Sequence, residues 1–370
     1  MNVLVANLGS TSFKYKLLDM SADGELLARG GYERIGQPGG EFKTHGDVID
    51  VILKDLPAKP DAIGFKAVHG GPISGAVRVT DEVLATMQEF ADVAPAHNPP
   101  YIAAMKAFRQ KLPQLPQVAA FETAFHQTIP LARQVYAIPY EWTEKLGVRR
   151  YGFHGASHRY VATRVRELLG PDARRVISCH LGGSCSICAI ENGRSVAHSF
   201  GMTAQSGVPH ANRVGDFDTF ALLKLTREGL TLDEIFKKLG KEGGMLGMSG
   251  VSPDMRDIEK AASEGNARAR LALDAFVESV RSFIGSYLVA LGGIDVLVFT
   301  GGIGENGAAI REAICRNLDW VGISLDPLKN QVRGKETKIS KVESGAEVWI
   351  LPTNEELIVA RQTVAVLNAN

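Results

Sequence analysis

The feature that most constrains how this chain folds is a pattern of strand, glycine turn and strand that occurs twice. The first copy lies at residues 3–14, VLVANLGSTSFK, and the second at residues 175–187, RVISCHLGGSCSI. In both copies an apolar run meets a Leu-Gly turn and continues as a second strand, which predicts a β-hairpin whose bend exposes backbone N–H groups. One such bend is typical of an ordinary hairpin. Two copies, each opening one half of the chain, favour a duplicated fold that handles nucleotides.

The length of the chain predicts two domains. At 370 residues it exceeds the roughly 250 to 300 residues at which single hydrophobic cores stop growing. We expect an N-terminal domain over residues 1–150 and a C-terminal domain over residues 151–370, with the last helix packing back toward the first domain.

The composition is that of a globular protein without a strongly charged partner. Hydrophobic residues make up 45% of the chain and charged residues 22%. The 41 Lys and Arg residues balance the 41 Asp and Glu residues, which argues against nucleic acid or a membrane as the main partner. Any anion that the protein binds must therefore be held by local groups.

The N-terminus and the cysteines predict a cytoplasmic protein. The sequence begins MNVLVAN, without the basic segment or cleavage site of a signal peptide, and no run of about 18 apolar residues occurs. Four cysteines, at 179, 185, 188 and 315, are too few for a disulfide framework. Cys185 and Cys188 have the spacing of a metal or redox pair, but residues three apart in a strand point to opposite faces, so we expect no metal there.

Hydrophobic periodicity predicts two α/β domains that face a cleft. Strands are expected within 2–18, at 24–31, 61–69 and 118–121, in the hairpin at 175–187, and at 295–300 and 347–351. Helices are expected at 81–92, 100–112, 157–169, 218–227, 232–239 and 266–291, and from 308 onward. Residues 33–47 are polar and rich in glycine, which predicts a loop. Residues 301–306, GGIGEN, are expected to form a turn, and Thr353 with Glu356 to form a capping box for a final helix.

Short motifs along nearly the whole chain resemble those of the acetate kinase family, which belongs with sugar kinases, Hsp70 and actin. In family order, the chain carries NLGSTSFKYKLLD at 7–19, VHGG at 68–71, HNPP at 97–100, AFHQTIP at 124–130, RRYGFHGASHRYV at 149–161, CHLGG at 179–183, SGVSPDMRDI at 249–258, FTGGIGEN at 299–306 and PTNEEL at 352–357. The resemblance implies two duplicated ribonuclease H-like domains, of the actin-like ATPase kind, facing a nucleotide cleft. It also implies a homodimer.

The same resemblance implies an activity. The family transfers a phosphoryl group between acetyl phosphate and ADP, or from ATP to acetate, with Mg²⁺. Such a reaction needs positioning and positive charge around a spreading negative charge more than it needs covalent chemistry. The implied substrates are therefore a small carboxylate and ATP or ADP.

Roles for individual residues are carried over from the family motifs. His154 and Arg213 are implied to stabilise the transferring phosphoryl group, and Glu122 to complete the catalytic set; Asn7 and Glu355 are implied to serve the metal. The implied nucleotide site comprises Lys14, His180, Leu181, Gly182, Gly183, Ser184, Asp254, Met255, Arg256, Gly302, Ile303, Gly304, Glu305 and Asn306. The implied acid pocket comprises Lys66, Val68, Ala96, Phe153 and Ala204.

Each of these residues also has a simpler interpretation. His154 could be a core histidine, Asn7 a turn cap, and Asp254 an acid at a helix start. Glu355 could be an acid favoured by the dipole of the final helix. Glycines 301, 302 and 304 form a pattern common at strand ends, which gains weight because a buried strand precedes it and a helix follows.

The chain departs from the family pattern on the acid and phosphoryl side. Lys66 stands where the family has arginine, which offers a planar fork instead of a compact charge. Glu122 replaces an aspartate, and Gly183 replaces an asparagine. The segments 197–201, AHSFG, and 210–213, HANR, replace Asp-Thr-Ser-Met-Gly and Met-Gly-Thr-Arg. Two implied walls of the acid pocket are small, because Ala96 stands for leucine and Ala204 for proline.

These departures leave alternatives open. The protein could prefer propionate or butyrate, since a wider pocket accommodates additional buried methylenes. It could instead be a nucleotide-binding regulator or scaffold of the same fold that has lost acyl kinase chemistry, or a kinase for a hydroxyl group such as that of a sugar. The presence of Asn7, Lys14 and His154 favours an enzyme.

Overall fold

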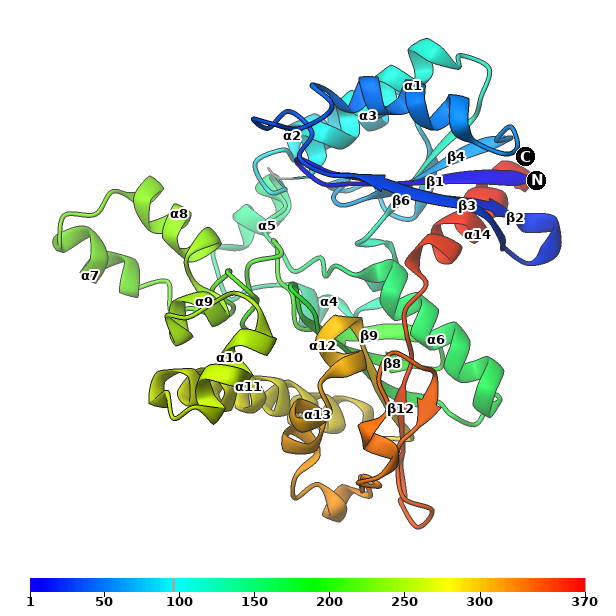
Figure 1. The fold of residues 1–370 in the computed structure, drawn as a ribbon. Coiled ribbons are helices and arrows are strands. Elements are labelled where there is room, and N and C mark those ends of the chain that lie inside the picture. The colour runs from blue at the N-terminus through cyan, green and yellow to red at the C-terminus, as the bar shows by residue number, and fades with distance from the viewer. Residues whose placement is uncertain (95–96, 370) are drawn as a thin grey trace.

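Two six-stranded mixed sheets of the same topology form the fold (Figure 1). The computed structural model describes residues 1–94 and 97–369. The first sheet has the order β3-β2-β1-β4-β6-β5 and the second the order β11-β12-β10-β7-β8-β9. The strands of the first are β1 (Asn2–Leu8), β2 (Phe13–Asp19), β3 (Glu25–Tyr32), β4 (Ala62–Ala67), β5 (Ala76–Arg78) and β6 (Gln117–Phe121). Those of the second are β7 (Arg175–His180), β8 (Ser186–Glu191), β9 (Arg194–His198), β10 (Val296–Thr300), β11 (Thr337–Lys338) and β12 (Glu347–Ile350).

The pairing of the strands repeats between the two sheets. In each sheet three antiparallel strands form a meander, β1 to β3 or β7 to β9. The first strand of the meander then pairs in parallel with β4 or β10, which pairs in parallel with β6 or β12. A short antiparallel strand, β5 or β11, closes each edge. The predicted duplication of an α/β fold is thereby confirmed.

Helices cover both faces of each sheet. The first sheet has α1 (His45–Asp55), α2 (Asp81–Glu89) and α3 (Asn98–Lys111) above it in Figure 1 and α14 (Glu355–Asn368) below it. The other α-helices are α4 (Leu131–Gln134), α5 (Tyr140–Leu146), α6 (Gly155–Leu169), α7 (Ala221–Arg227), α8 (Leu232–Lys241), α9 (Gly244–Ser249), α10 (Met255–Ser263), α11 (Ala267–Leu291), α12 (Gly301–Asn306) and α13 (Ala308–Cys315). Short 3₁₀ turns lie at Met20–Ala22, Ala124–Thr128, Asp319–Val321 and Lys329–Gln331. None of the described helices is both long and apolar enough to cross a membrane.

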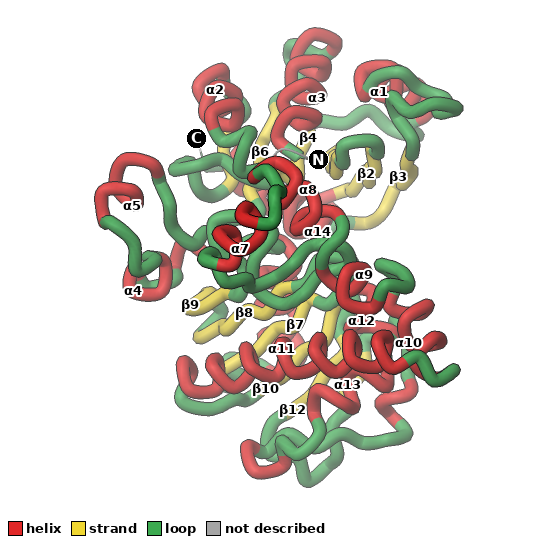
Figure 2. Tube along the Cα trace, turned by 90° about the vertical axis from the view of Figure 1, so that its left-hand side faces the viewer, coloured by secondary structure: helices red, strands yellow, loops and turns green. Residues whose placement is uncertain are grey.

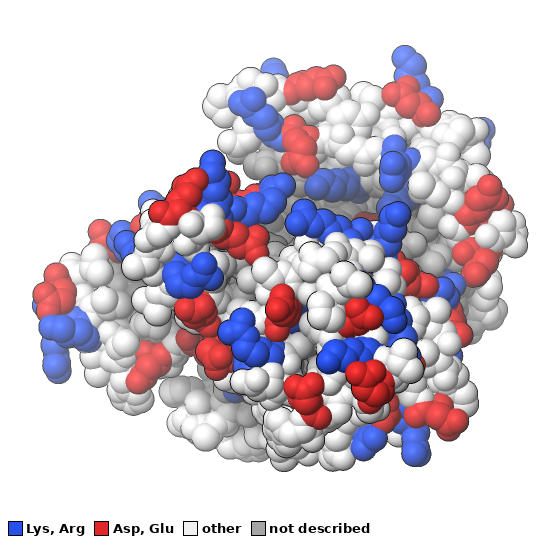
Figure 3. All heavy atoms as spheres, turned by 60° about the horizontal axis from the view of Figure 1, so that its bottom comes forward, with Lys and Arg blue, Asp and Glu red and all other residues white. Residues whose placement is uncertain are grey.

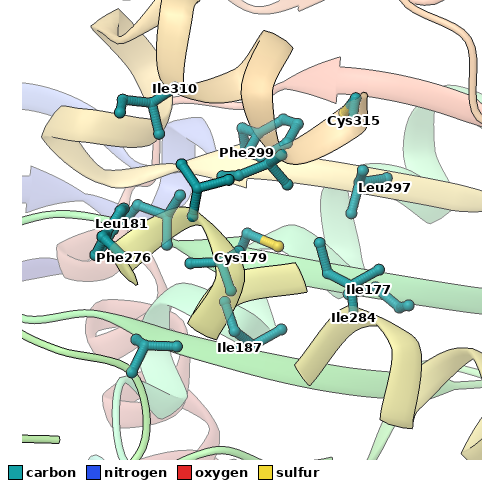
Figure 4. Close-up of a cluster of buried hydrophobic side chains, with 14 of the residues drawn as sticks. Ile177, Cys179, Leu181, Ile187, Phe276, Ile284, Leu297, Phe299, Ile310 and Cys315 are labelled. Carbon is teal, nitrogen blue, oxygen red and sulfur yellow. The ribbon is translucent and has the colours of Figure 1, made fainter. Parts of the chain in front are cut away.

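Helix α11 forms the largest core together with the second sheet. It runs across the strands in Figure 2 and buries Phe276 and Ile284 against Ile177, Leu297 and Phe299 of the sheet (Figure 4). Its apolar residues recur at three- and four-residue steps, as the sequence predicted for 266–291, so one broad face is buried. This core fixes the carboxyl ends of β7 and β10, where the site is built.

The last helix of the chain completes the core of the first sheet. Ile358, Val359 and Ala360 of α14 are buried together with Val3 and Val5 of β1. The other side of α14 contacts α6, so this helix lies between the first sheet and the second half of the chain. The division of the chain at residue 150 stays a prediction.

Several predictions of local structure were wrong. Residues 33–47 are not wholly loop, because α1 begins at His45 behind a capping box between Thr44 and Asp47. Residues 301–306 form helix α12 rather than a turn. The final helix is capped by Asn354, whose Oδ1 accepts from the Leu357 N–H at 3.4 Å, and not by Thr353.

Other predictions were close to the structure. The predicted helix 218–227 begins only at Ala221, and 100–112 begins earlier, at Asn98, because proline is tolerated in a first helical turn. The predicted strands 61–69 and 295–300 correspond to β4 and β10. All four cysteines are buried and free.

Truncation of Phe108 should destabilise the first core strongly. The side chain is fully buried, and its ring packs edge-on against Phe13 and Phe65 at centroid distances of 6.4 and 5.7 Å. We expect Phe108→Ala to lower the free energy of unfolding by about 3 to 5 kcal/mol in urea titrations. Phe220→Ala, at a side chain that is 78% exposed, should change it by less than about 0.5 kcal/mol. Equal effects of the two variants would contradict this packing.

Candidate functional site

Two neighbouring cavities collect most of the predicted site residues. The central cavity, of about 630 Å³, is lined by residues that include Asn7, Lys14, Lys66, Val68, His97, Tyr101, Glu122, Phe153, His154, Ser184, Ala204, Arg213, Lys237 and Lys241. The glycine cavity, of about 680 Å³, is lined by residues that include Gly182, Gly183, Asp254, Met255, Arg256, Gly302, Ile303 and Asn306. Since Ser184 follows Gly183 directly, the bend between β7 and β8 adjoins both cavities.

A few predicted site residues lie outside both linings. Leu181 and Gly304 are buried in the core beside the bend, and Glu305 accepts a hydrogen bond from the Gly301 N–H at 2.9 Å. His180 and Glu355 lie beside the central cavity without lining it. Ala96 falls outside the described residues.

The glycine cavity is shaped by a tight contact between the β7–β8 bend and the end of β10. The Leu181 N–H donates to the Thr300 carbonyl at 2.8 Å, and the Leu181 carbonyl accepts from Ile303 and Gly304 at 2.8 and 3.0 Å. Gly301 has φ +76°, and a Cβ there would lie 2.7 Å from the Leu181 oxygen. Glycine is therefore required at residue 301, which accounts for part of the GGIGEN pattern.

An ion pair borders the other side of the glycine cavity. Asp254 caps α10 by accepting from the Arg256 N–H, and its carboxylate pairs with the Arg256 guanidinium at 2.5 Å. Hydrogen bonds from Arg256 lower the pKa of Asp254 to about 2. Asp254 therefore does act as an acid at the start of a helix, as its simpler interpretation holds. The side chain of Arg256 is 87% exposed and lines the cavity.

A cluster of buried charged side chains adjoins the central cavity. Lys66 Nζ of β4 contacts Glu355 Oε2, the first residue of α14, at 2.5 Å. Burial alone would lower the pKa of Lys66, but the carboxylates of Glu355 and Glu122 outweigh it and raise that pKa. Burial alone would raise the pKa of Glu355, but Lys66 and His180 outweigh burial and lower that pKa. Lys66 and Glu355 are therefore both charged.

Glu122 is the third member of this cluster and has no direct partner. Both of its carboxylate oxygens are buried, and neither has a hydrogen-bond partner among the described residues. Burial raises its pKa to about 7, against the opposing effect of Lys66. Its backbone carbonyl accepts from the Gly155 N–H at 2.9 Å, and a Cβ at Gly155 would lie 2.2 Å from that oxygen. The glycine that follows His154 is therefore required by this close approach.

His154 projects from a strained position at the start of α6. It caps the helix with φ 56°, a left-handed conformation that is uncommon for residues other than glycine. Its Nδ1 lies 2.9 Å from Ser186 Oγ, and its ring packs against Phe200 and His180 at centroid distances of 5.3 and 4.1 Å. Burial holds the pKa of His154 well below the usual range of histidine, so the ring is neutral.

Arg213 lines the same cavity as His154 and is held by the backbone. Its guanidinium donates to the Ala204 carbonyl, and burial lowers its pKa from the usual arginine value without removing its charge. Tyr101 was missed by the sequence analysis: its hydroxyl accepts from the Leu8 N–H at 2.9 Å and lies 3.5 Å from Asn7 Oδ1. Its place directly after the HNPP motif was the available signal.

Lys237 and Lys241 of α8 were also missed. They line the central cavity together with Lys14, Lys66 and Arg213, so five cationic side chains surround it. Lys and Arg side chains likewise gather around a hollow near the middle of the face drawn in Figure 3. The sequence predicted the helix that carries the two lysines but gave no signal that this helix reaches the cavity.

Comparison with known proteins decides which family the geometry belongs to. The family model described as the acetokinase family matches residues 47–361. The chain belongs to the acetokinase family. An acetate kinase of Dictyoglomus thermophilum is 46% identical to it over 397 aligned positions, covering 99% of both chains.

Solved structures of acetokinase relatives agree in fold. The crystal structure of Porphyromonas gingivalis acetate kinase matches with a TM-score of 0.91 and 42% identity, covering 99% of this chain and all of that one. A propionate kinase from Francisella tularensis matches with a TM-score of 0.92 and 35% identity, covering 99% of each chain. The actin-like α/β fold that the resemblance implied is thus confirmed.

The buried carboxyl group of Glu122 should make stability depend on pH. Its pKa is about 7 in the folded protein, above the ordinary 4.5, so the wild type loses stability as pH rises from about 4.5 to about 7. Glutamine does not titrate. We therefore expect the unfolding free energy of Glu122→Gln to rise relative to the wild type across this window and to stay level above it. Urea titrations at a series of pH values measure the difference.

The control for this prediction is an exposed glutamate. Glu278→Gln removes a carboxylate whose side chain is 74% exposed, so it should not reproduce the effect that burial produces in Glu122→Gln. A pH-independent difference for Glu122→Gln would contradict the raised pKa.

Proposed function

We propose that the protein transfers the γ-phosphoryl group of ATP to acetate or a slightly larger short-chain carboxylate, and catalyses the reverse reaction. A carboxylate oxygen attacks the γ-phosphorus, the bond from phosphorus to the ADP oxygen breaks, and the products are an acyl phosphate and ADP. The observation that carries the proposal is the central cavity, where Lys66, Arg213 and neutral His154 lie together beside the glycine cavity. Membership of the acetokinase family supports the same reaction.

We assign a different part of the substrates to each cavity. We assign the nucleotide to the glycine cavity, where the bend at Gly182 and Gly183 faces Asp254 and Arg256. We assign the acid and the transferring phosphoryl group to the central cavity. Arg213 and His154 would donate hydrogen bonds to the phosphoryl oxygens, where such charge stabilisation is worth most because water is excluded.

The residues of the central cavity also suit Mg²⁺. This cation prefers oxygen ligands and is usually held by one or two carboxylates together with substrate phosphates. Asn7 and Glu355 would supply protein oxygens, and the unpartnered carboxylate oxygens of Glu122 lie in the same cluster. When bound, Mg²⁺ adds positive charge at the phosphate oxygens. Lys66 then fixes the orientation of Glu355 through their ion pair.

A hydroxamate assay tests the proposed activity. The protein, ATP and Mg²⁺ are incubated with acetate, propionate, butyrate or a sugar, and acyl phosphate is trapped with hydroxylamine while ADP is measured separately. We expect acyl phosphate from at least one carboxylate. ADP release with the sugar alone would favour a sugar kinase, and no turnover with any acid would favour a regulator or scaffold. Light scattering on the purified protein tests the homodimer, which together with a cytoplasmic location remains a proposal.

Arg213→Ala should lower turnover more than nucleotide affinity. Removing one charged donor from a phosphoryl site costs about 10²- to 10³-fold in kcat, by analogy with oxyanion sites, while contacts to the adenosine are unaffected. The matched control is Arg256→Ala in the glycine cavity, which should raise the KM for ATP with a smaller effect on kcat. Steady-state kinetics with ATP varied measure both. A variant at Arg213 that kept its turnover and lost only ATP affinity would refute the assignment.

A preference for acids longer than acetate is the second candidate function. Val68, Phe153 and Ala204 line a central cavity of about 630 Å³, and the small side chain of Ala204, where the family has proline, would leave space for a longer alkyl chain. We expect kcat/KM to rise from acetate to propionate or butyrate, since each buried methylene contributes about 0.8 kcal/mol. Ala204→Leu should reverse the order, whereas Ala204→Gly should preserve it. A preference of the wild type for acetate over every longer acid would contradict this proposal.

A further inference from the structure

A chain of serine and histidine side chains connects the interior of the second half to His154. Ser178 Oγ of β7 lies 2.9 Å from His158 Nδ1, and His158 Nε2 lies 2.8 Å from Ser186 Oγ of β8. Ser186 Oγ lies 2.9 Å from His154 Nδ1. Ser178, His158 and Ser186 have no exposed surface. The order of contacts is thus Ser178, His158, Ser186 and His154.

The protons along this chain can be arranged in two ways if the rings stay neutral and Ser186 donates to one ring while it accepts from the other. If Ser186 accepted from both rings, its own buried proton would have no acceptor among the described residues. A serine hydroxyl has one proton, and a neutral imidazole has one N–H and one acceptor nitrogen. In the inward arrangement His154 donates from Nδ1 to Ser186, Ser186 donates to His158 Nε2, and His158 donates from Nδ1 to Ser178. In the outward arrangement every donor is reversed, so that Ser178 donates to His158 and Ser186 donates to His154.

Ser178 distinguishes the two arrangements. Its only hydrogen-bond partner among the described residues is His158 Nδ1. In the inward arrangement the Ser178 hydroxyl would accept from His158 and leave its own proton without an acceptor, although the residue is fully buried. An unsatisfied buried donor costs about 1 to 3 kcal/mol. The outward arrangement gives the protons of Ser178, His158 and Ser186 an acceptor, and it leaves only the Nε2 proton of His154, a residue that lines the central cavity. It is therefore favoured.

We propose that Ser178, His158 and Ser186 are positioning residues that hold His154 in the tautomer protonated on Nε2, so that its ring donates a hydrogen bond into the central cavity. Nδ1 accepts from Ser186, and Nε2 is the ring nitrogen left for a ligand of the cavity that His154 lines. Phe200 and His180 pack against the ring and limit its rotation. This inference rests on the proposed function, because it defines what His154 offers to the phosphoryl group.

The tautomer matters because the two nitrogens have opposite effects on a phosphoryl oxygen. Nε2–H donates to the oxygen as negative charge spreads onto it, whereas an Nε2 lone pair would repel the same oxygen. Burial keeps the His154 ring neutral, so only one of its two nitrogens carries a proton. The hydrogen-bond partner of Nδ1 determines whether that proton is on Nδ1 or on Nε2. The serine and histidine chain supplies that partner.

Nitrogen NMR of the intact protein reads the tautomer directly. The nine histidines are labelled with ¹⁵N, and the His154 signals are assigned by their loss in His154→Gln. We expect a protonated Nε2 and an unprotonated Nδ1 throughout pH 6 to 8, without nucleotide or acid present. A protonated Nδ1 would overturn the proposal. This readout does not depend on turnover, so it can fail or succeed independently of the proposed kinase activity.

Kinetics of Ser186 variants test the consequence. In Ser186→Ala the hydroxyl that donates to His154 is lost, so we expect both tautomers by NMR and a three- to tenfold lower kcat, with the KM for ATP changed by less than about twofold. Ser186→Thr retains the hydroxyl and should restore both the single tautomer and kcat. If Ser186→Ala does not fold, the wild-type NMR measurement still decides the proposal.

A matched control separates positioning from general damage. Ser195 is also a buried serine beside a histidine. Among the described residues its Oγ contacts only His126 Nδ1, at 2.9 Å, and Cys188 Sγ, at 3.3 Å, and neither belongs to the chain that ends at His154. Ser195→Ala should leave the His154 tautomer and kcat within about twofold of the wild type. Equal losses of kcat in Ser195→Ala and Ser186→Ala, or an unchanged kcat in Ser186→Ala, would overturn the positioning role.

Discussion

The buried ion pair between Lys66 and Glu355 is the interaction on which the rest of the site depends. Lys66 belongs to the middle of the first sheet, and Glu355 is the first residue of the helix that follows the last strand of the second sheet. Burying two charges is costly unless each is well paired. Removing one partner of a buried pair typically destabilises the fold by about 3 to 5 kcal/mol, because the other charge is left buried without a partner. The pair therefore joins the two halves of the chain beside the central cavity. Glu122 is close enough to raise the pKa of Lys66, and its own pKa is raised by Glu355.

The interior around His154 is unusually rich in aromatic and imidazole rings. His158 packs edge-on against His126 and His198 at centroid distances of 5.8 and 5.2 Å, and His126 and His198 lie tilted to each other at 4.1 Å. Each ring is kept neutral because burial lowers its pKa. Serine hydroxyls, which can donate or accept, separate several of the rings. Such a network specifies one arrangement of side chains, since a partly satisfied buried polar network is less stable than an apolar one.

The sequence was sufficient to predict the duplicated architecture, because each sheet begins with a hairpin that has a Leu-Gly bend, and apolar strands follow it. It also indicated most of the residues that line the two cavities, through motifs whose glycines and charges have a physical purpose. It could not indicate Lys237 or Lys241, because periodicity places a residue on a helix face but does not say what that face meets, and its only signal for Tyr101 was the preceding HNPP motif. The cap by Asn354 and the helix at residues 301–306 were also not predicted, because neighbouring residues offered equally good local alternatives: Thr353 as the cap and a glycine turn in place of the helix.

The position of α14 has a consequence for the synthesis of the chain. The inner face of the first sheet, which includes Val3 and Val5, is covered by Ile358, Val359 and Ala360. Those residues leave the ribosome only after the whole second sheet has been made. The apolar surface of the first strands therefore stays uncovered until α14 has been made, and during this interval a chaperone would protect the nascent protein from aggregation.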